Sequence, residues 1–193
     1  MFTGIIEATA KVEKLETQQS NLHLTLSCPF TQELKIDQSL AHNGVCLTVV
    51  VINGNTYTVT AIKETLDKTN LGTLRVGDSV NVERCMPANG RFDGHIVQGH
   101  VDQTGTCTKV EDLNGSWMYS FEHAAQGNIT VEKGSICING VSLTVVNSGA
   151  NTFSVCIIPY TYEHTTFKYL QPGHKVNLEF DVIGKYVAKM MGK

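Results

Sequence analysis

An internal repeat limits the folds open to this chain more than any other feature. At a shift of 96 residues, Ser39–Glu83 matches Ser135–Glu179 at 19 of 45 positions without a gap. The best-preserved stretches, NGVCLTVV at 43–50 and NGVSLTVV at 139–146, differ at a single residue. Two units of about 90 residues are too few and too long for a solenoid, and they fit a duplicated small domain. The sequence therefore predicts two similar domains, and with them two similar pockets.

The repeat continues upstream with a slip of one residue. Gly4–Glu7 (GIIE) lies over Gly99–Asp102 (GHVD). We therefore expect both halves to begin with the same strand.

Composition excludes several classes of partner. The net charge of −3 and the pI near 6.1 give no basic surface for nucleic acid or an anionic membrane. The sequence has no apolar run long enough for a transmembrane helix, and its N-terminus lacks the features of a signal peptide. We expect a cytoplasmic protein with no nucleic-acid or membrane partner.

The six cysteines do not have the spacing of a metal site or a redox pair. No C-x-x-C pair is present, and no cysteine has a histidine at a metal-ligand spacing. In a cytoplasmic chain most cysteines are reduced and buried like small apolar residues. We expect no metal site, and we expect this structural role for five of them: Cys28, Cys85, Cys107, Cys137 and Cys156. Cys46 is considered separately below.

Short alternating patterns predict an all-β protein. Val45, Leu47, Val49 and Val51 would share one face of a strand, Asn53-Gly54 is a hairpin signal, and Tyr57, Val59 and Ala61 would share a face of the next strand. The second half repeats this order. Closure would remove the exposed edges of each six-stranded sheet. We predict two tandem, pseudo-symmetric six-stranded Greek-key β-barrels with short helices near 64–71 and 162–170 and a C-terminal helix.

The predicted boundaries follow from breaks in these patterns. Residues 1–86 would form the N-terminal barrel, 87–97 a linker without periodicity, 98–182 the C-terminal barrel and 183–193 a terminal helix. Asp181 would cap that helix. Its apolar stripe must pack on something, either its own barrel or the same helix of other subunits, and the pattern does not distinguish these. The stripe comprises Ile183, Tyr186, Val187 and Met190.

Strand alternation places small polar side chains on the face opposite the barrel core. Cys46 and Thr48 share this face in the first copy, and Ser142 and Thr144 share it in the second. Fixed hydroxyl and thiol groups suit a planar polar heterocycle, although for one copy alone ordinary β-forming residues facing a neighbouring layer are the better explanation. Retention of the whole octapeptide in both copies favours a binding site.

Two histidines flank the dense segment GHIVQGHVD at the domain junction. His95 and His100 are five residues apart, which does not suit joint metal binding, but either one is suited to acid–base chemistry near neutral pH. The sequence has no Gly-rich phosphate loop, no G-x-S-x-G and no paired acid motif. We therefore expect no cofactor. The remaining histidines, which we expect to be structural or solvated, are His23, His42, His123, His164 and His174.

Several motifs together resemble the riboflavin synthase family, the lumazine-dismutating type built on duplicated barrels. They are MFTGIIE, AHNGVCLTV, the KETL–TNLG segment, GHIVQGHVD, KGSICINGVSLTV, IIPYT–EHTT and VNLEFDVIGKYV, and they extend from Met1 to about Val187. The resemblance implies a reaction that transfers a four-carbon unit between two molecules of 6,7-dimethyl-8-ribityllumazine. The products are riboflavin and 5-amino-6-ribitylaminouracil, and no cofactor takes part.

The resemblance also implies the substrate contacts. For the N-terminal barrel they are Gly4, Ile5, Ile6, Cys46, Leu47, Thr48, Thr60, Ala61, Ile62, Lys63, Glu64 and Thr65. For the C-terminal barrel they are Gly99, His100, Val101, Lys133, Ser142, Leu143, Thr144, Ile158, Pro159, Tyr160, Thr161, Tyr162 and Glu163. Of these, Glu64, Thr65 and Lys133 are expected at the ribityl hydroxyls.

The catalytic groups implied by the resemblance are Ser39, Cys46, His95, His100 and Asp181. Our hypothesis is that Cys46, or a water that it positions, adds to C7 of one lumazine while His100 assists proton transfer. The resemblance further implies a homotrimer joined by C-terminal helices, and lumazine synthase as a further partner. Two alternatives are a non-catalytic lumazine or flavin carrier of the same fold and the flavin-binding barrel of ferredoxin reductases. The cysteine and histidine positions argue against the carrier, and the absent Arg-x-Tyr-Ser type strand argues against the reductase.

Overall fold

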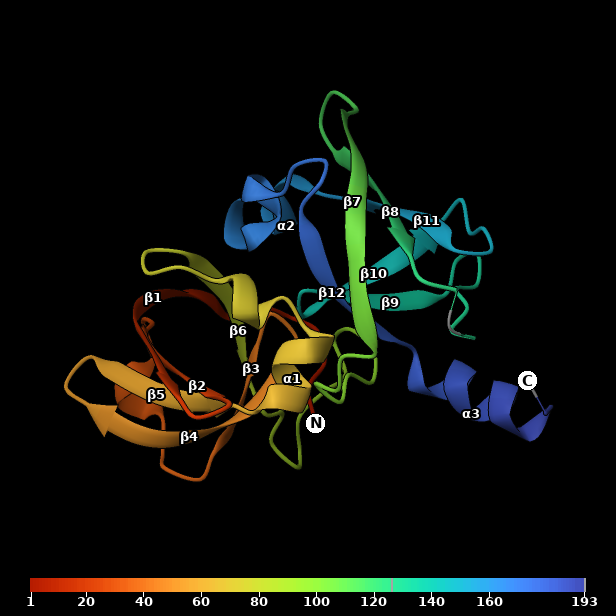
Figure 1. Ribbon diagram of the computed structural model, residues 1–193. Helices are drawn as coiled ribbons and strands as arrows, with labels where there is room; N and C mark the ends of the chain where they lie inside the picture. Colours follow the sequence, from red (N-terminus) through yellow and green to blue (C-terminus); the bar gives the residue numbers. More distant parts are fainter. Residues whose placement is uncertain (126, 193) are drawn as a thin grey trace.

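The computed structural model describes residues 1–125 and 127–192 and shows two closed antiparallel β-barrels (Figure 1). This confirms the predicted fold class. The strands of the N-terminal barrel are β1 (Ala8–Gln18), β2 (Asn21–Ser27), β3 (Ser39–His42), β4 (Val45–Asn53), β5 (Thr56–Ala61) and β6 (Ser79–Arg84). Those of the C-terminal barrel are β7 (Gln103–Asp112), β8 (Trp117–His123), β9 (Ser135–Ile138), β10 (Val141–Val146), β11 (Thr152–Ile157) and β12 (Lys175–Phe180). The strand order is β1-β2-β5-β4-β3-β6 in the first barrel and β10-β11-β8-β7-β12-β9 in the second.

Short helices connect the strands at equivalent places in the two halves. Helix α1 (Lys63–Lys68) follows β5 and helix α2 (Pro159–His164) follows β11, so both begin before the expected segments. Single 3-10 turns lie at η1 (Thr31–Glu33), η2 (Leu71–Thr73) and η3 (Thr166–Tyr169), and helix α3 (Val182–Met190) ends the fold. Among the described residues, no helix has the length and apolar character that crossing a membrane requires.

Each barrel encloses its own apolar core. Tyr57, Val59 and Ala61 of β5 are completely buried, as the alternation predicts. His42 lies in the same core, where one ring nitrogen pairs with the Tyr57 hydroxyl at 3.0 Å and the other with the Leu40 carbonyl at 3.1 Å. Burial lowers the pKa of His42 to about 4, so this histidine is neutral and structural, as expected.

The expected face of Val51 is wrong. Val45, Leu47 and Val49 point into the core, but Val51 is exposed because the pairing of β4 with β5 shifts register between Val49 and Val51. An extra residue in one strand reverses the side-chain alternation beyond it. Cys156 is also exposed, since Phe153, Val155 and Ile157 occupy the inner face of β11. All six cysteines are free, and of the five expected to be buried only Cys107 and Cys137 are fully so.

The two Asn-Gly turns of the repeat touch each other where the barrels meet. Gly44 and Gly140 have φ angles of +79° and +84°, and a Cβ on Gly44 would lie 2.8 Å from the Gly140 nitrogen. Only glycine accommodates both this backbone conformation and this close approach. Retention of Asn-Gly in both copies therefore has a structural cause at the barrel interface.

Two buried asparagines hold this interface through reciprocal hydrogen bonds. The Asn81 Nδ2 atom donates to the Asn139 carbonyl, and the Asn177 Nδ2 atom donates to the Asn43 carbonyl, both at 2.9 Å. Their Oδ1 atoms accept from backbone N–H groups of the opposite halves, Asn81 from Thr166 at 2.8 Å and Asn177 from Asn70 at 2.6 Å. Because equivalent residues of the two repeats make equivalent contacts, these contacts relate the two barrels by a pseudo-twofold axis.

Each half begins with an equivalent strand, β1 or β7, as expected, and the matched residues Gly4–Glu7 and Gly99–Asp102 form the segments that precede these strands. Phe2 and Val97 are equivalent in the repeat and pair with each other, N to O at 2.7 and 3.1 Å. Buried Glu83 accepts hydrogen bonds from Thr3 and Gly4, and buried Glu179 accepts them from the backbone N–H groups of Gln98, Gly99 and His100. These carboxylates fix the path of the two segments.

Helix α3 projects away from the barrels (Figure 1). The Asp181 carboxylate accepts a hydrogen bond from the Ile183 N–H at 2.9 Å, so Asp181 caps the helix as predicted. The Lys185 ammonium binds Asp102 at 2.9 Å. The apolar stripe of the helix is exposed, and docking on its own barrel, one of the two expected alternatives, is not observed. The expected terminal segment ends at Lys193, which lies outside the described residues.

Candidate active site

One pocket of about 300 Å³ lies at the mouth of the N-terminal barrel. Strand β4, helix α1 and the segment after the linker each supply part of its wall. The lining residues are Val45, Cys46, Glu64, Thr65, Lys68, Thr69, Gly99, His100 and Val101. The structure thus brings together the predicted residues Cys46 and His100, which are far apart in the sequence.

The segments before the barrels exchange partners, which corrects an expectation from the sequence. Gly99–Val101, expected at the C-terminal barrel, lies against the N-terminal one, where the Cys46 N–H donates to the Gly99 carbonyl at 2.9 Å. Gly4–Ile6 lies against the C-terminal barrel, where the Ser142 N–H donates to the Gly4 carbonyl at 2.8 Å. Each half of the chain therefore packs a segment against the barrel of the other half, and at the N-terminal barrel this segment completes the pocket.

Glycine is required at both crossing points. Gly4 and Gly99 have φ angles of +77° and +79°. A Cβ on Gly99 would lie 2.6 Å from the Cys46 Cβ, and one on Gly4 would lie 2.6 Å from the Ser142 Cβ. The crossing segments consequently lie directly on the thiol and hydroxyl residues that distinguish the two repeats.

The Cys46 thiol is partly buried. Burial raises its pKa, a hydrogen bond with Ser39 opposes the rise, and nearby Cys85 adds to it. The thiol is therefore protonated at neutral pH. A thiolate forms only when a base removes this proton.

A second polar pair lies at the C-terminal barrel. The Nδ1 atom of His95 is 2.6 Å from the Ser142 hydroxyl oxygen. Burial lowers the pKa of His95, and nearby Asp181 opposes this effect. In the tautomer that carries its proton on Nε2, the neutral imidazole accepts a hydrogen bond from the Ser142 hydroxyl, which polarises the O–H bond. The Asp181 carboxylate caps α3 and lies near this pair rather than near Cys46.

The two barrels are not equivalent at these positions. In the repeat alignment, Ser142 is equivalent to Cys46, and Ile5 is equivalent to His100. On the two helices, Tyr160 and His164 replace Glu64 and Lys68, and the Tyr160 and His164 rings stack with centroids 4.1 Å apart. One junction histidine lies at each barrel: His100 lines the pocket at the N-terminal barrel, and His95 bonds to Ser142 of the C-terminal barrel.

Several other predicted contact residues have partners within the protein. The Thr60 hydroxyl pairs with His23 at 2.8 Å, and the Lys63 ammonium pairs with Asp67 at 2.8 Å. The Tyr162 ring stacks on Trp117 at 4.0 Å. Leu47 is in the barrel core, while Thr48 and Thr144 are exposed on the outer face. Lys133 has a φ angle of +63° in the turn before β9, and its backbone N–H donates to the Val145 carbonyl.

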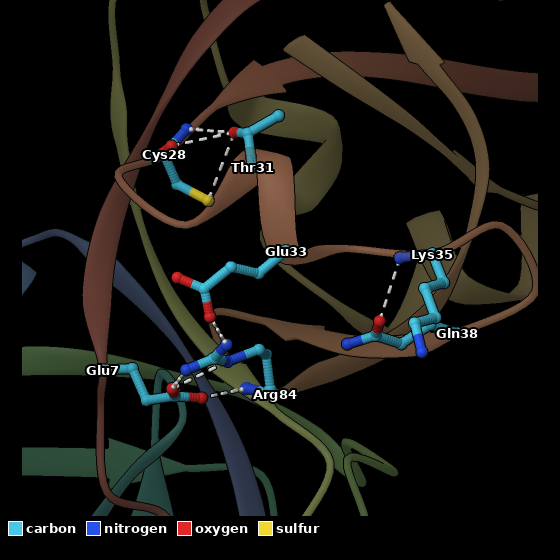
Figure 2. Close-up of polar contacts among 7 residues, drawn as sticks. All are labelled: Glu7, Cys28, Thr31, Glu33, Lys35, Gln38 and Arg84. Atoms are coloured by element: carbon cyan, nitrogen blue, oxygen red, sulfur yellow. Dashed lines mark hydrogen bonds and ion pairs between the residues drawn. The ribbon is translucent and has the colours of Figure 1, made fainter. Parts of the chain in front are cut away.

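A larger hollow of about 600 Å³ lies beside β6 and the linker, but it is a weaker candidate. Figure 2 shows one of its cationic groups, the Arg84 guanidinium, held between the carboxylates of Glu7 and Glu33. The same guanidinium lies 4.6 Å from the centre of the Phe30 ring. Because these acids already neutralise Arg84, this guanidinium has little affinity left for an anion.

Sequence reasoning missed Lys68 and Thr69 as lining residues. A signal was available in helix α1, where Glu64 and Lys68 are four residues apart and so share one face with the expected pocket residue Thr65. It also missed Glu83 and Glu179, whose role depends on the crossing segments and has no local signature.

Comparison with known proteins agrees with this geometry. The lumazine binding domain family matches residues 3–85 and again 98–181. The chain is 40% identical over its whole length to a riboflavin synthase of Actinobacillus pleuropneumoniae, covering 91% of that protein. It is 42% identical to a riboflavin synthase of Mycobacterium bovis, over 99% of this chain and 98% of the other. The chain belongs to the riboflavin synthase family. Members of this family are enzymes, and the two matched segments coincide with the two barrels.

Solved structures support the fold of this riboflavin synthase family member. The crystal structure of LumP complexed with 6,7-dimethyl-8-(1'-D-ribityl) lumazine superposes with a TM-score of 0.85 at 20% identity, over 93% of this chain and 98% of that one. LumP complexed with riboflavin superposes equally well at 22% identity. At this identity the likeness establishes the duplicated barrels alone.

Proposed function

We infer that the protein is a riboflavin synthase, which dismutates two molecules of 6,7-dimethyl-8-ribityllumazine to riboflavin and 5-amino-6-(D-ribitylamino)uracil. The observation that carries this inference is the full-length match to riboflavin synthases in a chain whose two repeats carry different polar residues at equivalent positions. A reaction between two identical substrates requires one to lose a proton from its C7 methyl and the other to accept carbon at C7. Two pockets that differ in acid–base groups suit this division.

The N-terminal pocket is suited to activate the acceptor at C7. Cys46 and His100 line it together, and the Ser39 hydroxyl bonds to the Cys46 thiol. The thiol is protonated at rest, so either its proton passes to a base as sulfur adds, or the thiol positions a water that adds instead. His100 is the imidazole at this pocket and assists that proton transfer.

The C-terminal pocket is suited to deprotonate the donor. The Ser142–His95 pair supplies a neutral imidazole that draws the hydroxyl proton, with Asp181 nearby. A serine oxygen or a water polarised in this way can take a proton from the C7 methyl. No redox step occurs, since the pteridine ring of each lumazine is its own electron acceptor.

The remaining substrate contacts are proposals. At the N-terminal barrel we propose Cys46, Leu47 and Thr48, the run Thr60, Ala61, Ile62, Lys63, Glu64 and Thr65, and the crossing residues Gly99, His100 and Val101. At the C-terminal barrel we propose Ser142, Leu143 and Thr144, the run Ile158, Pro159, Tyr160, Thr161, Tyr162 and Glu163, the crossing residues Gly4, Ile5 and Ile6, and Lys133. We also propose that the N-terminal barrel ends at residue 86, the linker at residue 97 and the C-terminal barrel at residue 182.

Assembly into a homotrimer through α3 is supported by the exposed stripe of Ile183, Tyr186, Val187 and Met190. An apolar face of this kind on a projecting helix favours self-association. A light-scattering mass of three chains for the protein, and a smaller mass for Val187→Asp, would agree with this assembly. The free cysteines support a cytoplasmic location. Association with lumazine synthase stays an untested prediction.

The proposed function is tested by incubating the purified protein with the lumazine alone and following riboflavin fluorescence. We expect riboflavin and the diaminouracil in equal amounts. Cys46→Ala should lower kcat by about 100-fold or more while lumazine affinity changes little. Tight binding of lumazine without product would instead identify a carrier of the same fold.

A further inference from the structure

Lys68 ends helix α1 at the mouth of the N-terminal pocket, where it lines the cavity together with Glu64 and Thr65. The other lysine of this helix, Lys63, is held by Asp67 at 2.8 Å. In the part of the chain that the structure describes, no carboxylate lies within ion-pair distance of the Lys68 ammonium. Lys68 therefore brings to the pocket an ammonium group that no ion pair holds.

The repeat does not preserve this charge. His164 occupies the equivalent position on α2, where its ring stacks on Tyr160 and its Nδ1 atom pairs with the Tyr160 carbonyl at 2.9 Å. The N-terminal pocket thus has an ammonium group at this position, and the equivalent position at the C-terminal barrel has an imidazole held by Tyr160. This is a third difference between the pockets, beside Cys46 against Ser142 and His100 against Ile5.

Both steps of the proposed reaction create a negative charge on a lumazine. Removal of a methyl proton leaves the electron pair of the C–H bond in the ring. Addition of a thiolate or hydroxide at C7 forms a C–S or C–O bond and moves the electron pair of the ring double bond at C7 through the conjugated ring into the pyrimidinedione. An ammonium in contact with the ring stabilises either anion, because an opposite charge within about 4–6 Å favours the charged form.

We propose that Lys68 contacts the lumazine bound in the N-terminal pocket and stabilises its anionic form, which makes Lys68 a catalytic residue. The proposal rests on the proposed function. The other ionisable groups of this pocket do not replace it, since Glu64 carries the opposite charge, Cys46 is a protonated thiol and His100 is an imidazole suited to moving a proton.

The test compares Lys68→Met, Lys68→Arg and the matched control Lys14→Met with the wild-type protein. Lys14 lies on β1, pairs with Glu16 at 2.8 Å and does not line the pocket. Rapid-scanning absorbance with protein in excess gives the ionisation of bound 6,7-dimethyl-8-ribityllumazine as a function of pH, before turnover. Steady-state assays give kcat and KM.

For Lys68→Met we expect the pKa of the bound lumazine to rise by about one unit and kcat to fall about tenfold, with KM changed less than about twofold. Lys68→Arg should restore both, and Lys14→Met should match wild type. A Lys68→Met protein with wild-type lumazine ionisation overturns the proposal, whether or not kcat falls. A wild-type protein that binds lumazine but makes no riboflavin refutes the proposed function instead, and the ionisation measurement still decides the role of Lys68.

Discussion

The Nδ1 atom of His95 lies 2.6 Å from the hydroxyl oxygen of Ser142, although the two residues are 47 positions apart. His95 comes from the linker, and its backbone N–H donates to the Thr3 carbonyl at 3.1 Å, so the crossing N-terminal segment holds the ring in place. This pair lies at the C-terminal barrel, whereas at the N-terminal barrel His100 lines a pocket together with Cys46. The two repeats thus share one fold but carry different polar groups at equivalent places.

His95→Gln should reduce kcat by about 100-fold, the usual effect of removing a general base, with a small change in KM. Because burial lowers the pKa of His95, the acid limb of the wild-type kcat profile should fall below the ordinary histidine value of 6.5, and the variant should lack it. The pH dependence of riboflavin formation measures this limb. A variant with the wild-type limb would exclude His95 as the titrating group.

The sequence predicted most of the fold because the repeat and the alternation are local signals. Tyr57, Val59 and Ala61 follow a period of two, and Asn53-Gly54 marks a hairpin. The face of Val51 was predicted wrongly because the one-residue bulge before it has no clear sequence signal. The alternation also predicts the faces of Cys46 and Ser142.

The crossing of the two segments was beyond sequence reasoning. The alignment equates Gly4 with Gly99, but it does not tell which barrel each one touches. That relation depends on Glu83 and Glu179, buried carboxylates that bind backbone N–H groups of the segments. The His95–Ser142 pair and the asparagine network at the interface are also products of packing.

Asn81→Ala should destabilise the protein by about 2–4 kcal/mol, because it leaves the buried Asn139 carbonyl and Thr166 N–H without partners. Urea unfolding measures the change. Asn55→Ala, at an exposed hairpin turn, is the control and should cost less than about 1 kcal/mol. Equal losses for the two variants would show that the network does not hold the barrels together.

Gly44→Ala should cost more stability than Gly54→Ala. Both glycines have positive φ angles, +79° and +54°, so both variants carry backbone strain of about 1–2 kcal/mol. Only at Gly44 does the new Cβ meet the other barrel, 2.8 Å from the Gly140 nitrogen. Thermal unfolding should show a clearly lower Tm for Gly44→Ala. A Tm at or above that of Gly54→Ala would contradict the close contact.

His42 should make the protein less stable in mild acid. In the unfolded chain its pKa is near 6.5, whereas burial lowers it to about 4 in the fold, so the unfolded state binds the proton first. Stability is therefore lost as pH falls from about 6.5 to 4, by about 3 kcal/mol at most. Denaturant unfolding of wild type and His42→Gln measures the difference. Burial raises the pKa of Glu83 and Glu179, which acts with the opposite sign but cancels in this comparison.

The central claim is that two similar pockets perform opposite roles because their reactive residues differ. The most direct test is the double exchange Cys46→Ser with Ser142→Cys, which keeps both groups in the molecule but moves each to the other pocket. We predict that the double variant binds the lumazine within a few-fold of wild type, while its rate of riboflavin formation falls by about 100-fold or more. Riboflavin formation at the wild-type rate would contradict the claim, because the pockets would then be interchangeable.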